Sequence, residues 1–124
     1  MEQENSETEI DFDHLNQYVG GDVDLTAEIF GLFKNQVDML EKSLVPSADD
    51  DVWAAVTHSL KGTAKAVGAI RLAEICEKAE GYIGENNRPG ARDLAAAEIE
   101  SRIALVGIDI QRWEYRQTLN RMRS

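Results

Sequence analysis

The sequence predicts an all-α protein, namely an antiparallel up-down four-helix bundle with a short extra helix near its N-terminus. Apolar residues recur at the three- and four-residue steps that are typical of helices. No stretch alternates with period two for long enough to indicate a sheet. The segments between the helices are short and contain glycine or proline, which favours antiparallel neighbours. With 124 residues, the chain has the usual size of one domain.

The first two helices are expected over Phe12 to Val19 and over about Asp24 to Leu44. The second of them carries an apolar stripe with steps of three and four residues, which predicts one buried face. The members of this stripe are Ile29, Phe33, Val37, Leu40 and Leu44.

The third helix is expected to run to about Val67, and Ser47 is placed to cap its start. The aspartates that follow Ser47 suit the positive first turn of a helix. Gly68 can end the helix in a left-handed conformation. The apolar face of the helix consists of Trp53, Val56, Leu60, Ala64 and Val67.

Two further helices complete the predicted bundle. The apolar face of the first consists of Leu72, Ile75, Ala79 and Tyr82. After a turn at Pro89-Gly90, a long last helix covers roughly Ala91 to Met122. Its core seam alternates steps of four and three, as expected in an antiparallel bundle. The seam residues are Ile99, Ile103, Val106, Ile110 and Trp113.

The chain is strongly acidic, with a net charge of −10. Many of the acids precede the first helix, so we expect residues 1–10 to form an acidic, flexible tail and residues 11–124 to form a single domain. Because an acidic surface repels phosphate backbones, nucleic-acid binding is not expected. The basic residues near the other end are interpreted as helix-terminal charge. They are Arg112, Arg116, Arg121 and Arg123.

No apolar run approaches the roughly 20 residues that span a bilayer. The first residues also lack the basic and apolar parts of a secretory signal. We therefore expect a cytoplasmic protein without a membrane segment. We expect one bundle to bury the apolar stripes of all four of its helices, which favours a monomer. The lone Cys76 is expected to be a buried thiol.

His58 is the residue whose position points to a chemical role. At about 100° of rotation per residue, His58 lies about 160° from Leu60, on the side opposite the apolar face. Its imidazole is therefore expected to face solvent. Ala54, Ala55 and Gly62 lie about one turn away on the same face. They predict a low surface above which the ring stands and to which a partner can come close.

Two lysines, Lys61 and Lys65, are expected on the same side as His58, where they would form a small positive site in an acidic protein. A neutral imidazole is a nucleophile. If the electrophile is a phosphoryl group, ammonium groups can stabilise its oxygens, and small neighbours allow a bulky donor to approach in line. Surface lysines are, however, more often plain solvated charge.

The stretch His58-Ser59-Leu60-Lys61-Gly62, followed by Gly68-Ala69, resembles the signature of histidine-containing phosphotransfer (HPt) domains. That signature is H-x-x-K-G with a second glycine further on. The resemblance implies a four-helix bundle whose exposed histidine carries a phosphoryl group on its outer ring nitrogen. It also implies exchange of this group with aspartates of response-regulator receiver domains, which hold the magnesium and include those of hybrid sensor kinases. The chain would then be a carrier without a cofactor or an ATP site of its own.

Position by position, the resemblance makes His58 the phosphoacceptor and Lys61 the cation that stabilises the phosphoryl group. Gly62 becomes the residue that gives clearance to the partner, and Gly68 the turn that ends the helix. Lys65 is carried over less directly, because family members often have a polar or basic residue there rather than a fixed lysine. Further on, the family pattern is matched by Leu72, Cys76 and Glu80, whereas Ala79 replaces a leucine.

Three other functions are alternatives to phosphotransfer. A helical adaptor could use the same face to bind a response regulator or another partner without phosphotransfer, but both His58 and Lys61 argue for chemistry. A histidine kinase fragment would need a glycine-rich ATP domain, of which the sequence shows no trace. A metal site is not expected, because His14, His58 and Cys76 do not make a converging set of ligands.

Overall fold

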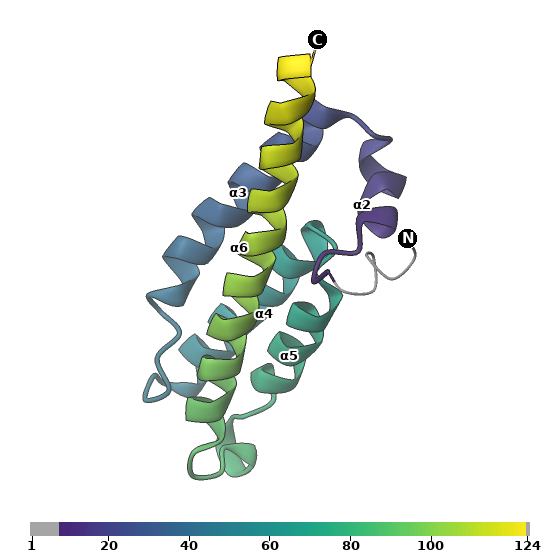
Figure 1. The fold of residues 1–124 in the computed structure, drawn as a ribbon. Helices are drawn as coiled ribbons and strands as arrows, with labels where there is room; N and C mark the ends of the chain where they lie inside the picture. The colour runs from purple at the N-terminus through teal and green to yellow at the C-terminus, as the bar shows by residue number, and fades with distance from the viewer. Residues whose placement is uncertain (1–7, 124) are drawn as a thin grey trace.

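The computed structural model describes residues 8–123, which form helices joined by short connections (Figure 1). The described residues contain no strand, so the all-α prediction is confirmed. The elements in chain order are α2 (Phe12–Val19), α3 (Val23–Glu41), α4 (Asp50–Ala66), α5 (Ile70–Glu80), the 3₁₀ turn η1 (Gly84–Asn86) and α6 (Ala91–Arg123).

The four longer helices pack around one core. α4 packs chiefly against α5 and α3, and α6 packs chiefly against the same two helices. α4 and α6 therefore lie at opposite corners of the molecule. The longest helix, α6, has 33 residues and runs along the front in Figure 1. Among residues 8–123, no helix combines the length and the apolar character that crossing a bilayer requires.

The apolar stripes predicted from the sequence form this core. All five residues predicted for the apolar face of α4 are buried, as are the predicted α6 residues except Trp113, which is partly buried. Phe30 is fully buried next to the stripe predicted for α3, although it does not belong to that stripe. The Phe30 ring meets the rings of Phe12 and Trp113 edge to face. It thereby joins α2 to α3 and α6.

The connection between α3 and α4 differs from the prediction. α3 ends at Glu41 rather than at Leu44, although Leu44 is still buried. α4 begins at Asp50 with Asp49 as its N-cap residue, so the prediction that Ser47 caps this helix was wrong. The physical reason lies in α6, because Arg92 binds the carbonyl groups of the residues around Ser47 and holds them outside a helix.

Arg92 is an internal anchor for the connections at one end of the molecule. Its side chain is only 3% exposed. The guanidinium donates hydrogen bonds to three backbone carbonyls from two connections, those of Tyr82 at 2.9 Å, Pro46 at 3.1 Å and Ala48 at 2.7 Å. It also forms an ion pair with Asp50 at the start of α4. Arg92 thus satisfies loop carbonyls that would otherwise lack a donor.

The segment before α2 is packed against the domain, which corrects the expected tail boundary. Ile10 is fully buried, and the backbone N–H groups of Glu9 and Ile10 donate to the Asp109 carboxylate at 2.6 and 3.0 Å. The N–H of Asp11 donates to the carbonyl of Gly68 at 2.9 Å. Residues 8–10 therefore do not belong to a free tail. The rest of the expected tail lies outside the described residues.

Gly68 ends α4 as predicted, with a φ of 78°. A side chain here would be strained, because this region of φ favours glycine. A Cβ atom would also come within 3.0 Å of the carbonyl oxygen of Asp11. The turn at Gly68 thus brings the segment before α2 against the end of the helix that carries His58.

Cys76 lies in the core, as the sequence predicts. Burial raises the pKa of its thiol to about 12, against a smaller opposite effect of the Lys61 ammonium. A thiol that stays protonated is a poor nucleophile, so this residue has a packing role.

Candidate functional site

His58 stands on the outer side of α4. Its side chain is 66% exposed, whereas Leu60 two residues later is fully buried. The prediction of an outward imidazole is therefore confirmed. α4 is held in this orientation by Trp53, which is fully buried and donates from its indole N–H to the carbonyl of Ala79 in α5 at 2.8 Å.

The surface beside His58 is low, as the small residues of α4 predicted. A Cβ atom built on Gly62 would meet no atom within 4 Å. Ala55 is exposed and Ala54 is partly buried. Towards α3, a shallow hollow is lined by Gln36, Met39, Leu40, Ser59, Gly62 and Thr63. A partner that reaches His58 therefore meets only small residues of α4 at Ala54, Ala55 and Gly62.

Glu80, the last residue of α5, lies directly beside the imidazole. Its Oε2 atom is 3.2 Å from His58 Nδ1, and its Oε1 atom is 3.5 Å from Lys61 Nζ. One carboxylate thus contacts both residues that the sequence motif singles out. A carboxylate next to Nδ1 favours a proton on that nitrogen, which leaves Nε2 as the nitrogen with the free lone pair.

In the sequence, Glu80 is only a match to a family pattern, which indicates no role for it. No spacing within one helix could reveal the contact, because Glu80 belongs to the neighbouring helix. The sequence predicts a small positive site beside His58. In the structure, Lys61 is partly buried and its positive charge is paired with the Glu80 carboxylate.

Lys65 does not join this group. It is exposed and lies two turns along α4 from His58, where it lines a second hollow with His14, Tyr18, Ala66 and Ile70. The structure thus brings Lys61 and Glu80 into the surroundings of His58, and places Lys65 next to α2. Within residues 8–123, no three His, Cys, Asp or Glu side chains come together in a group that could hold a metal ion.

A comparison with protein-family models gives the same family as the motif. The model of the Hpt domain matches residues 20–124, from the end of α2 to the C-terminus. The chain belongs to the Hpt domain family. Searches among curated proteins and among solved structures found no match.

Hpt domains take part in two-component phosphorelays, where they act as histidine phosphotransfer carriers and interact with receiver domains. The matched residues include α3 to α6, and hence His58, Lys61 and Glu80. α2 precedes the matched residues, so the family model does not cover the contact between Phe12 of α2 and Phe30.

Proposed function

We propose that His58 accepts a phosphoryl group from the aspartyl phosphate of one receiver domain and passes it to an aspartate of another. The observation that carries the proposal is the exposed His58 ring with its Nδ1 beside Glu80 and low residues around it. We also propose that α3 to α6 follow the antiparallel up-down order of a four-helix bundle, which agrees with the helices that pack together.

The transfer step needs no cofactor bound to this chain. The lone pair of His58 Nε2 attacks the phosphorus atom, the bond from phosphorus to the aspartate oxygen breaks, and the carboxylate leaves with its electron pair. The proton stays on Nδ1, so the phosphorylated ring is cationic. Glu80 is placed to stabilise this cation at 3.2 Å. The reverse sequence returns the phosphoryl group to a second receiver.

Lys61 is proposed to stabilise the phosphoryl oxygens. Its ammonium lies one turn from His58 and is held by Glu80 at 3.5 Å, which limits the positions that it samples. Charge-assisted hydrogen bonds to an anion are stronger than neutral ones. Lys65 is proposed to have, at most, a secondary role in the approach of the partner.

The direct test is phosphoryl transfer from labelled receiver domains to the full chain. We expect radiolabel from a phosphorylated receiver to appear on this protein and to be chased by a second receiver that is not phosphorylated. A partner that binds the chain without any transfer would instead support a helical adaptor.

Glu80 is predicted to position the His58 ring. Glu80→Ala should slow single-turnover transfer by about tenfold, which corresponds to about 1.4 kcal/mol. The transfer rate of Glu80→Gln should lie between those of Glu80→Ala and the wild type. Its amide oxygen can still accept a hydrogen bond from Nδ1 but carries no charge. Nitrogen NMR should show that the ring loses its preference for a proton on Nδ1 in the alanine variant.

The matched control for Glu80 is Glu77→Ala, which removes an exposed carboxylate from the same helix. Its transfer rate and its His58 spectrum should equal those of the wild type. If Glu80→Ala leaves both the rate and the tautomer unchanged, the 3.2 Å contact has no role in the chemistry.

Gly62 is predicted to lower the stability of the fold while leaving the receiver free access to His58. It lies in the middle of α4, where glycine costs about 1 kcal/mol relative to alanine. Gly62→Leu should therefore raise the melting temperature by about a few degrees. The same side chain would stand one turn from His58 and obstruct the receiver, so transfer should slow and binding should weaken. Gly62→Ala should fall between the two.

Gly31→Leu is the control for this change. Gly31 also lies within a helix, α3, and a Cβ atom there would likewise meet no atom within 4 Å. We expect a similar gain in melting temperature and an unchanged transfer rate. A Gly62→Leu protein that transfers at the wild-type rate would show that the receiver does not dock over this face.

A further inference from the structure

The outer side of α6 carries a row of exposed apolar side chains. The core seam occupies the inner side of this helix. The outer row lies opposite to it, at about 160° around the helix for a rotation of 100° per residue. We call this row the outer stripe. It consists of Leu94, Leu105, Ile108, Tyr115, Leu119 and Met122, each at least 37% exposed.

The spacing of the outer stripe is that of a helix-packing seam. Steps of four and three connect residues 94, 98, 101, 105, 108, 112, 115, 119 and 122, and only Glu98, Ser101 and Arg112 in this series are polar. A sustained alternation of this kind is typical of a helix that packs against another helix. Figure 1 shows no element over the outer side of α6. The stripe therefore lacks a partner within the described chain.

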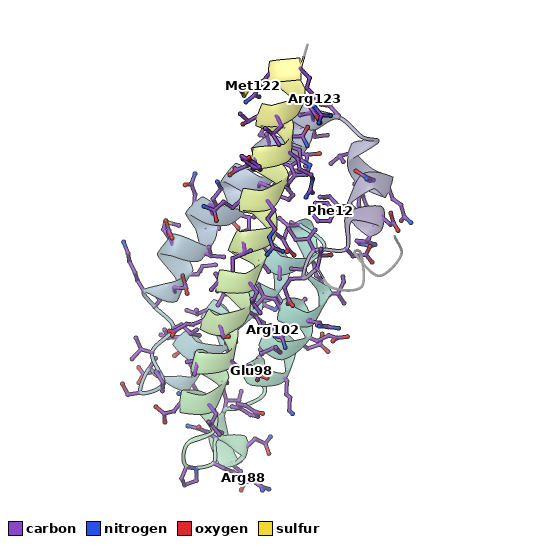
Figure 2. All side chains as sticks on the ribbon, viewed as in Figure 1. Phe12, Arg88, Glu98, Arg102, Met122 and Arg123 are labelled. Carbon is purple, nitrogen blue, oxygen red and sulfur yellow. The ribbon has the colours of Figure 1, made fainter. Side chains whose placement is uncertain are left out.

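Charge is distributed unevenly along α6. In the half near its start, the acids are Asp93, Glu98 and Glu100, and the two bases, Arg92 and Arg102, are already paired with Asp50 and Glu9. In the half near its end, four arginines outnumber Asp109 and Glu114. Figure 2 shows Glu98 towards the lower end of the helix and Arg123 at the upper end. The helix dipole explains charges only within the terminal turns. Arg112 and Arg116 lie before the last turn, and neither forms an ion pair among residues 8–123.

The acidic half also gathers like charges from the neighbouring helix. The pKa of Glu41 in α3 is raised by burial first, and then by the carboxylates of Glu100 in α6 and Asp38 in α3. In the basic half, Glu114 is already paired with Lys34 at 2.8 Å, so it does not neutralise the arginines around it. The two halves of α6 therefore present unbalanced charges of opposite sign.

We propose that the outer stripe is an interface between two copies of this chain, whose α6 helices pack antiparallel about a two-fold axis near Gly107. This arrangement places Ile108 of both copies close to the axis. It sets Glu98 of each copy opposite Arg116 of the other and joins each acidic half to a basic half. A parallel pair would bring acid to acid and base to base. The expectation of a monomer is replaced by this proposal.

The self-paired arrangement fits the charges better than an anionic lipid surface does. A membrane would attract the basic half of α6, but it would repel the acidic half and a chain with a net charge of −10. The outer stripe extends along both halves, from Leu94 to Met122. Only a partner with its own acidic and basic segments matches the full length.

The test is sedimentation equilibrium of the full chain over a range of concentrations. We expect a mass that rises from 13.8 kDa to twice that value. Ile108→Glu should weaken the dimer by more than about tenfold, because it brings two carboxylates together at the axis. Leu32→Glu is the control, since Leu32 is an exposed apolar residue of α3, 58% exposed, that lies outside the stripe. It should not change the dimer.

A charge exchange tests the antiparallel order. Glu98→Arg and Arg116→Glu should each weaken the dimer by about tenfold, because two opposed pairs become repulsive. The double variant should return to near the wild-type constant, because the pairs are restored with exchanged signs. Helicity by circular dichroism should be equal for all variants.

A chain that stays monomeric at several hundred micromolar overturns the proposal, and so does a dimer unaffected by Ile108→Glu. Binding of a monomeric chain to anionic vesicles, lost in Ile108→Glu, would also overturn it and assign the stripe to a membrane.

Discussion

His58→Gln should abolish phosphoryl labelling of this protein and leave its stability almost unchanged. Glutamine lacks the imidazole nitrogen that attacks phosphorus. The side chain of His58 is exposed, and substitutions at such positions typically change stability by less than about 0.5 kcal/mol. Incubation with a labelled receiver and a thermal melt of the same sample measure the two effects. Labelling that persists would contradict the assignment.

The control for His58 is the other histidine of the chain. His14 lies in α2, where its ring packs against that of Tyr18 with centroids 5.3 Å apart. Among residues 8–123, the His14 ring forms no ion pair of the kind that His58 makes with Glu80. His14→Gln should therefore keep full labelling. Label that maps to His14 in the wild-type protein would move the site to α2 and overturn the mechanism.

Arg92→Met should cause the largest loss of stability of any single change proposed here. The substitution keeps a long apolar side chain but removes the donors for the carbonyls of Tyr82, Pro46 and Ala48. It also leaves Asp50 without its cation. A buried acceptor left without its donor costs about 1–3 kcal/mol, whereas Asp50 is 55% exposed and the loss of its cation adds little. Urea denaturation should show a loss of this size in the free energy of unfolding.

Arg88→Met separates this effect from the mere loss of positive charge. Arg88 is an exposed arginine in the turn just before α6, and Figure 2 shows it at the lower end of the molecule. Its replacement should change the free energy of unfolding by less than about 0.5 kcal/mol. If Arg92→Met lowers the free energy of unfolding no more than Arg88→Met does, the buried hydrogen bonds of Arg92 do not hold the connections together.

The sequence predicts the helices well because each amphipathic stripe is a local pattern. The face of α4 from Trp53 to Val67 is buried as expected, and this face alone fixes the outward direction of His58. Gly68 is also predictable, since few residues other than glycine adopt its φ. The motif therefore draws attention to His58, and the helical period predicts the outward orientation that the structure shows.

The features that the sequence does not reveal depend on contacts between elements. Glu80 reaches His58 from α5, and Arg92 reaches the connection before α4 from α6. The latter contact decides where α4 begins, so a local capping signal at Ser47 gives the wrong start. Lys65 shares a helix face with His58 by spacing, yet α2 lies beside it and gives it other neighbours.

The opposite corners occupied by α4 and α6 have a practical consequence. Two copies joined through the outer stripe would meet on the side away from α4, so both His58 rings would stay accessible to receiver domains. One dimer could therefore bind two receivers at once, and the mass of its complex with a receiver would show two receiver molecules for each pair of chains.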